Sequence, residues 1–329
     1  MTTLPALSYP RAGRFFFDCI DIRGASGYLA APLEQHLAAV LRSDPFRIAI
    51  FLIASVLLHP VHADPRIEVA GHGTQDVVLI PEMATDGRTL QPIAEFLARC
   101  HPTHSFTLAG FAGQPADADS SSGAWLESID RYIAGLESHR AIIIGHGFGG
   151  VLGLRLALDH PERVARLVIL DALPAPSVRI MPKADSELVR SRADGMREAL
   201  LTQPAASFRL SQERMLAAAT LQAEHVPALV EWALASDRRT LADAQFEWFT
   251  TDLRNDIARI KVPTLVLVPW DVSHTEDTAT TLDLYRKQYA SLPEAQVKLI
   301  KGSRHYLTFD QPIVTNWAIE EFLGKCPQE

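Results

Sequence analysis

The segment from Ala141 to Gly150, AIIIGHGFGG, constrains the fold more than any other part of this sequence. Its first half is a short apolar run rich in β-branched residues, which is typical of a buried strand. Glycines follow at once, and residues Phe148 to Asp159 then have the apolar pattern of a helix. A buried strand that passes into a helix through a tight glycine turn is the basic unit of a parallel sheet covered by helices.

The same alternation of strand and helix patterns extends over most of the chain after residue 64. Strands are predicted at 66–70, 76–80, 105–109, 141–145, 166–170, 263–268 and 296–300. Helices are predicted at 89–99, from about 125 to 136, at 148–159 and at 312–323. This alternation predicts an α/β fold with a doubly wound, mostly parallel sheet.

The alternation stops between about residues 173 and 259, where helix-forming, charged and aromatic residues show no strand pattern. We therefore predict a helical cap at 173–259, above the carboxyl edge of a sheet built from residues 64–172 and 260–329. Large apolar side chains in the cap are expected to pack in its core or to line a pocket: Met196, Met215, Trp232, Phe246 and Trp248.

Residues 1–63 form an N-terminal extension of different character. An unbroken apolar stretch from Ile48 to Leu58 is preceded by Arg42 and Arg47, and the small-residue pattern Val-His-Ala follows at 61–63. This order is typical of a secretory signal peptide, here at about 41–63, and the run is short for a membrane span. We expect the true start near residue 40 and a periplasmic or secreted mature protein without a stable membrane span.

The glycine-rich turn resembles the nucleophile elbow of the α/β-hydrolase fold, G-x-S-x-G, which lies between a buried strand and a helix. Gly145 and Gly149 match the flanking small residues, and His146 matches the common G-H-S form. Gly147 stands at the nucleophile position, where an active member of the fold carries serine. The chain is thus similar to serine carboxylester hydrolases with the nucleophile replaced. Within that fold, the loop at 110–113 and the stretch from Trp270 to Tyr289 resemble exported bacterial esterase- or lipase-like members.

The resemblance also implies the other two members of a catalytic triad. His305 follows the last predicted strand, as the family's catalytic histidine does, and would act as general base and then acid. The triad acid is expected at Asp271, after the strand at 263–268. Asp171, at the end of the preceding strand, is the alternative, and Asp277 lies further along the same loop as Asp271.

An oxyanion hole of this family needs two backbone N–H groups. The resemblance implies Phe148, directly after the nucleophile position, and Met83, in the loop after the strand at 76–80. Glu82 stands in this loop where the family usually has a glycine, and a carboxylate beside a developing oxyanion would oppose acyl transfer unless it points to solvent. The sequence therefore departs from the family at two positions, both at the site of the chemistry.

Glycine has no atom that can attack an ester carbonyl, so acyl-enzyme chemistry through Gly147 is excluded. Three interpretations stay open. The first is natural loss of catalysis, with a pocket retained for a small ester-like or acyl ligand. The second is deliberate inactivation of a working ester hydrolase at residue 147, and the third is direct activation of water by His305.

A rival interpretation comes from the same glycines, because Gly145, Gly147 and Gly150 also spell G-x-G-x-x-G, the dinucleotide fingerprint. Asp171 then stands at about the distance of the acid that binds the ribose. Several strands precede the motif and a helical insertion follows it, which favours the hydrolase interpretation and no cofactor. A net charge of −8 without a basic run argues against a nucleic-acid partner, and we expect no metal site.

The resemblance carries one further expectation, about cysteines. In the α/β-hydrolase fold the first and last helices pack on the same face of the sheet. Cys100 ends the first predicted helix and Cys326 follows the last, so a disulfide between them is plausible, although two free thiols are equally allowed by the sequence.

Overall fold

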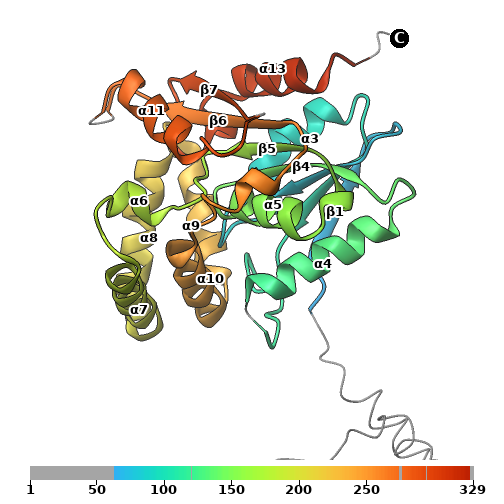
Figure 1. The fold of residues 1–329 in the computed structure, drawn as a ribbon. Helices are drawn as coiled ribbons and strands as arrows, with labels where there is room; N and C mark the ends of the chain where they lie inside the picture. Colours follow the sequence, from blue (N-terminus) through green and yellow to red (C-terminus); the bar gives the residue numbers. More distant parts are fainter. Residues whose placement is uncertain (1–62, 120, 274–275, 294, 327–329) are drawn as a thin grey trace, which may run out of the picture. The chain divides into compact units, whose positions relative to one another are not determined.

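The computed structural model describes residues 63–119, 121–273, 276–293 and 295–326, so the predicted signal peptide lies outside the described part of the chain apart from Ala63. Seven strands form one sheet in the order β1-β3-β2-β4-β5-β6-β7 (Figure 1). Only β1 is antiparallel to its neighbour; all the other pairs are parallel. The strands are β1 (Arg66–Ala70), β2 (Val77–Ile80), β3 (Thr103–Thr107), β4 (Ala141–His146), β5 (Val164–Leu170), β6 (Thr264–Trp270) and β7 (Ala295–Lys301). The predicted α/β fold with a mostly parallel sheet is confirmed.

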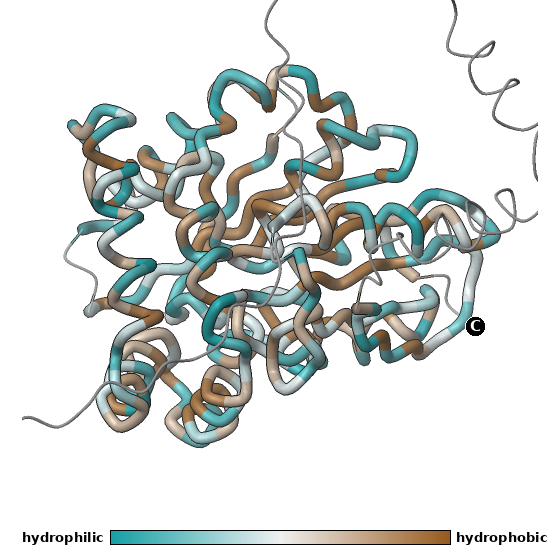
Figure 2. The backbone as a smooth tube through the Cα atoms, turned by 90° about the horizontal axis from the view of Figure 1, so that it is seen from below, coloured by the Kyte–Doolittle hydropathy of each residue, from teal (hydrophilic) through white to brown (hydrophobic). Residues whose placement is uncertain are grey.

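Helices cover both faces of this sheet because alternate side chains of a strand point to opposite faces. Ile142 and Ile144 of β4 share one apolar cluster with α3 (Gln91–Leu97) and α13 (Pro312–Leu323). Ile143 belongs to the other cluster, which includes side chains of α4 (Ser122–Gly135), α5 (Phe148–Asp159) and α11 (Thr278–Gln288). Figure 2 shows the strands as the apolar centre of the molecule between more polar helices.

Between β5 and β6 the chain forms helices, and these fully described residues contain no strand. Asp185 caps α7 and Asp237 caps α10, each accepting a hydrogen bond from a backbone N–H in the first turn. The helices lie at the end of the sheet where β4 runs into α5 (Figure 1). They are α6 (Ser177–Ile180), α7 (Ser186–Thr202), α8 (Ala205–Ala219), α9 (Val226–Ala235) and α10 (Arg238–Thr250). The stretch thus has the helical character expected for the cap.

The two cysteines flank helices of the same sheet face. Cys100 follows α3, Cys326 follows α13, and the two form a disulfide with a Cα–Cα distance of 5.7 Å. The structure therefore contains the bond that the resemblance implied. Among the described residues, no helix is long and apolar enough to span a bilayer.

Some element boundaries differ from the predicted ones. The strand expected at 105–109 is β3, at Thr103–Thr107, because Thr103 pairs with Ala70 of β1 and with Val77 of β2. The helix expected from residue 89 begins with a 3₁₀ turn, Gly87–Leu90, which Asp86 caps, and continues as α3. The first difference arises from strand partners that are distant in the sequence. The second arises from a capping residue that is local to the turn.

Candidate functional site

The turn between β4 and α5 has the backbone of a nucleophile elbow. Gly147 has φ 52° and ψ −113°, a left-handed conformation that glycine adopts without steric cost, and its N–H donates to the carbonyl of Leu170 on β5 at 2.9 Å. Gly149 packs directly on the backbone of Ile80 and Pro81, where a Cβ would overlap those atoms. The glycines therefore allow β2, β4 and α5 to approach closely at this point.

Glu82, in the loop after β2, points into this elbow and not to solvent. Its Oε2 accepts a hydrogen bond from the Phe148 N–H at 3.0 Å, and its Oε1 accepts one from the Met83 N–H at 2.7 Å. The Thr85 hydroxyl donates to the Glu82 carbonyl at 2.7 Å and fixes the loop. The two N–H groups expected to form an oxyanion hole thus converge on one anion, the side chain of Glu82.

The side chain of Glu82 fills the space in which a side chain at residue 147 would lie. A Cβ placed on Gly147 would come within covalent-bonding distance of Oε2 of Glu82, and it would also approach Cε1 of His305 at 3.0 Å. The carboxylate oxygen therefore takes the volume that the first side-chain atoms of any other residue at 147 would need. Glycine at 147 and glutamate at 82 are compatible with each other, and a seryl side chain at 147 would require the Glu82 carboxylate to move.

His305 connects Glu82 to the acid behind it. Its Nε2 lies 3.1 Å from Oε2 of Glu82, and its Nδ1 lies 2.7 Å from Oδ2 of Asp171. Burial alone lowers the pKa of His305, but the hydrogen bonds to Asp171 and Glu82 outweigh it and raise the pKa to about 10. The imidazole is thus a cation between two carboxylates at neutral pH, and it is not available as a general base.

The structure brings Asp171 to His305 and does not bring Asp271 there, so the first choice for the acid is corrected. Asp271 accepts a hydrogen bond from Nε of Arg304 at 2.6 Å and one from the Ser273 N–H, also at 2.6 Å. Asp277 caps α11 by accepting from the Thr280 N–H at 2.8 Å. The carboxylates after β6 are therefore occupied by loop and helix contacts that spacing along the sequence does not reveal.

Asp171 is held in place by two further side chains. It follows β5 with a φ of 43°, its Oδ1 accepts a hydrogen bond from the Tyr285 hydroxyl, and Nη1 of Arg179 lies 3.7 Å from the same oxygen. Burial raises the pKa of Asp171, but the hydrogen bond and the charge of His305 outweigh it and hold the pKa well below its usual range. Asp171 is therefore ionised, and neither Tyr285 nor Arg179 belongs to a motif that sequence analysis could use.

His146 contacts the loop that carries His305. Its Nε2 lies 2.8 Å from the backbone carbonyl of His305, to which it donates, and the two imidazole rings are 4.3 Å apart. Burial and the nearby charge of His305 lower the pKa of His146 to about 4, so the ring is neutral. The residue that matches the G-H-S form thus acts here as a hydrogen-bond donor that positions His305.

A cavity of about 600 Å³ opens above the elbow, between the sheet and the cap. Its lower end contains Glu82, Gly147, Asp171 and His305. Of the five cap residues selected from the sequence, Met196, Met215 and Trp248 line this cavity, whereas Trp232 and Phe246 pack beneath arginines outside it. Further apolar side chains of the cap also line the cavity: Leu173, Leu200, Leu216, Leu229, Ala233 and Leu241.

Comparison with known proteins now decides the family. A model of the alpha/beta hydrolase family matches residues 77–316, which include the elbow, the cap and His305. The chain belongs to the alpha/beta hydrolase family. Among curated proteins, this family member is 28% identical over 200 residues to RutD of Caulobacter sp. (strain K31), named as a carbamate hydrolase, with 60% of this chain and 70% of that protein covered.

Solved structures support the fold of this alpha/beta hydrolase family member. A hydrolase from Pseudomonas aeruginosa PA01 superimposes with a TM-score of 0.64 at 21% identity, over 78% of this chain and 93% of the other. The enol-lactonase from Burkholderia xenovorans LB400 superimposes with the same TM-score at 16% identity, over 79% of this chain and 96% of the other. At these identities the likeness shows the fold alone.

Family membership gives the glycine-rich turn its place in the hydrolase fold and leaves the dinucleotide interpretation without support. A pyrophosphate would bind at the N-terminus of the helix after the fingerprint. That place, at the N–H of Phe148, is taken by the carboxylate of Glu82. Asp171, the acid that would bind the ribose, contacts His305 and Tyr285.

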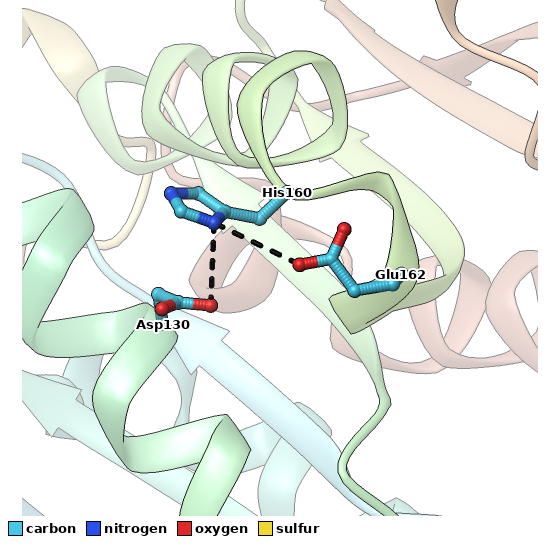
Figure 3. Close-up of side chains that lie close together, drawn as sticks. All are labelled: Asp130, His160 and Glu162. Carbon is cyan, nitrogen blue, oxygen red and sulfur yellow. Dashed lines mark ion pairs between the residues drawn. The ribbon is translucent and has the colours of Figure 1, made fainter.

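Three side chains near the C-terminal end of α5 lie close enough together to resemble a metal site. Figure 3 shows Nδ1 of His160 between the carboxylates of Asp130, at 3.4 Å, and Glu162, at 3.9 Å. Nε of Arg163 donates to the same Asp130 oxygen at 2.7 Å. A guanidinium at that oxygen would repel a metal cation, and the carboxylate of Asp130 is thus paired with Arg163.

Proposed function

We propose that this alpha/beta hydrolase family member does not carry out acyl-enzyme hydrolysis and instead uses its cavity to bind a small molecule. The observation that carries the proposal is the position of Glu82, whose carboxylate takes both oxyanion-hole N–H groups and the space above Gly147. An ester carbonyl would find neither a nucleophile nor a donor at this point. The cavity above the elbow is open and largely apolar, as a pocket for an ester-sized ligand is.

Direct activation of water by His305 is less well supported. A general base must be unprotonated and within hydrogen-bond reach of the water. Both ring nitrogens of His305 are engaged, and hydrogen bonds to the carboxylates of Asp171 and Glu82 raise its pKa to about 10. The position of Glu82 argues against a single deliberate change at residue 147, because a serine restored there would overlap the Glu82 carboxylate in its present conformation.

The catalytic half of the proposal is tested with p-nitrophenyl esters of short and medium acyl chains. We expect no turnover by the parent protein or by Gly147→Ser, and measurable turnover by the Glu82→Gly/Gly147→Ser double variant, in which a nucleophile and free N–H donors are both present. Turnover by Gly147→Ser alone would support inactivation of a working esterase. Turnover by the parent that His305→Ala abolishes would support water activation and overturn the proposal.

The binding half is tested with Nile red, a neutral dye whose fluorescence reports an apolar environment. We expect saturable binding by the parent, weakened by Ala199→Trp, because Ala199 lies on α7 and lines the cavity. Leu188→Trp is the matched control, since Leu188 is an exposed residue of the same helix outside the cavity. Equal binding by all three proteins would show that the dye binds elsewhere and would contradict the proposed pocket.

We also propose that the mature protein is exported, as the apolar run at 48–58 and the pattern at 61–63 indicate. The disulfide between Cys100 and Cys326 supports this location, because such bonds persist in oxidising compartments. N-terminal sequencing of the protein from periplasmic and culture fractions is expected to begin at Asp64. A mature protein that begins upstream of this residue and stays in the cytoplasmic fraction would contradict export.

A further inference from the structure

The hydrogen-bond donors at the elbow are already used within the protein. The N–H groups of Met83 and Phe148 both donate to Glu82, at 2.7 Å and 3.0 Å. The ring nitrogens of His305 are engaged by Asp171 and Glu82. An ester or ketone, whose carbonyl can only accept hydrogen bonds, therefore meets occupied donors at the point where the fold normally binds it.

What the elbow offers a ligand instead is an acceptor. A carboxylate has about four lone-pair positions for hydrogen bonds. Glu82 uses three of them, one on Oε1 and two on Oε2, and its side chain lines the cavity. About one acceptor position is left over, so a ligand group that donates a hydrogen bond can be satisfied there, whereas a ligand acceptor cannot.

The charges around the cavity are balanced. Glu82 and Asp171 are the carboxylates at its lower end, and the His305 imidazolium and the Arg179 guanidinium are the cations beside them. A charged ligand would bring an uncompensated charge into an otherwise apolar space, which is costly. Arg179 and the amide side chains of Gln203, Gln212 and Gln245 also line the cavity and can donate hydrogen bonds, so the preference for a ligand donor belongs to the elbow at Glu82.

We propose that the cavity binds a neutral alcohol, with the ligand hydroxyl donating to Glu82 and its apolar body lying against the cap. The direction of hydrogen bonding at the elbow is thereby reversed relative to an ester hydrolase. An ester hydrolase offers N–H donors to the ligand's carbonyl, whereas this site offers a carboxylate acceptor. This inference rests on the proposed function, namely that the cavity is a binding pocket. Glu82 is the residue that sets the specificity.

Two isomeric ligands test the reversal in the parent protein. 1-Octanol and 1-methoxyheptane have the same atoms, but only the alcohol can donate a hydrogen bond. Displacement of Nile red is expected to give an affinity about tenfold higher for the alcohol, since one hydrogen bond to a charged acceptor contributes on the order of 1.5 kcal/mol or more. Equal affinities, or a preference for the ether, would overturn the inference.

We expect the Glu82→Gly variant to show the opposite ligand preference. Removal of the carboxylate frees the N–H groups of Met83 and Phe148, so the variant is expected to prefer an acceptor, methyl heptanoate, over 1-octanol. Asp271→Asn is the matched control, because Asp271 contacts Arg304 and does not line the cavity, and it should keep the preference of the parent. If the Glu82 variant fails to fold, the comparison of 1-octanol with 1-methoxyheptane in the parent protein still tests the inference.

The outcomes separate this inference from the function it rests on. Nile red binding that no ligand displaces, and that Ala199→Trp leaves unchanged, would contradict the binding pocket itself. Displacement by the ether as strongly as by the alcohol would leave the pocket and overturn only the ligand class. Tighter binding of octanoate than of 1-octanol would also overturn it, because an acid would then replace the carboxylate of Glu82 in the hole.

Discussion

Oε2 of Glu82 occupies the space that a Cβ at residue 147 would need, so Glu82 and Gly147 form one structural unit. The two residues belong to different loops, one after β2 and one after β4, which lie side by side because these strands are neighbours in the sheet. The glycine at 147 and the carboxylate at 82 are thus parts of one arrangement of the elbow. Either residue without the other would leave an overlap or an empty anion site.

The coupling between Glu82 and Gly147 is expected to appear in the free energy of unfolding. Gly147→Ser places a side chain at positive φ and against Glu82, and we expect the free energy of unfolding to fall by about 2 kcal/mol or more. In Glu82→Gly/Gly147→Ser the overlap is gone, and part of this loss should be recovered. Urea unfolding of the two single variants and the double variant gives the interaction energy, expected to be at least about 1 kcal/mol.

A glycine elsewhere serves as the control for this cycle. Gly195 lies within α7 and a Cβ there would contact nothing, so Gly195→Ala should stabilise the protein by about 0.5–1 kcal/mol. It should do so equally with and without Glu82→Gly. Additive effects of the changes at 82 and 147 would show that the two residues do not share one space.

The charge of His305 is expected to make stability depend on pH. Its pKa is raised from about 6.5 in the unfolded chain to about 10, mainly by hydrogen bonds that outweigh its burial. The protonated ring therefore stabilises the fold fully below about pH 6.5, and this contribution is lost as the pH rises to about 10. Unfolding measured across this range should show a decline that His305→Gln reduces, and NMR should show the ring titrating near pH 10. A ring that titrates near 6.5 would contradict the carboxylate contacts.

The disulfide is expected to stabilise the protein. Cys100 and Cys326 are 226 residues apart in the sequence, and a bond that closes so long a loop restricts the unfolded chain strongly. Cys100→Ser/Cys326→Ser should lower the free energy of unfolding by about 2–4 kcal/mol. Reduction of the parent should produce a similar loss, and reduction of the double variant should produce none. Two thiols that react in the unreduced protein would show that the bond is absent.

The sequence predicts the fold well because the strands are marked by local apolar runs and the elbow by a local glycine pattern. The side-chain contacts of the site are less accessible. Glu82 could be recognised as a departure, but its direction depends on the N–H of Phe148, which lies 66 residues away. The choice of Asp171 over Asp271 depends on Tyr285 and on Arg304, which approach only in the folded chain. Long-range partners, and not residue types, decide both points.

Asp171 and Asp271 are expected to differ in their effect on His305. Asp171→Asn removes the carboxylate that receives Nδ1 of His305, so the pKa of His305 should fall, and the buried contact with Tyr285 should weaken. Asp271→Asn breaks the ion pair with Arg304 and should leave the His305 pKa unchanged. The two variants are matched in charge and size, and NMR titration of the His305 ring distinguishes them even if both lose some stability. If Asp271→Asn lowered the His305 pKa and Asp171→Asn did not, the acidic partner of His305 would be Asp271, in the loop after β6. The expected result would assign the partner of His305 to the end of β5.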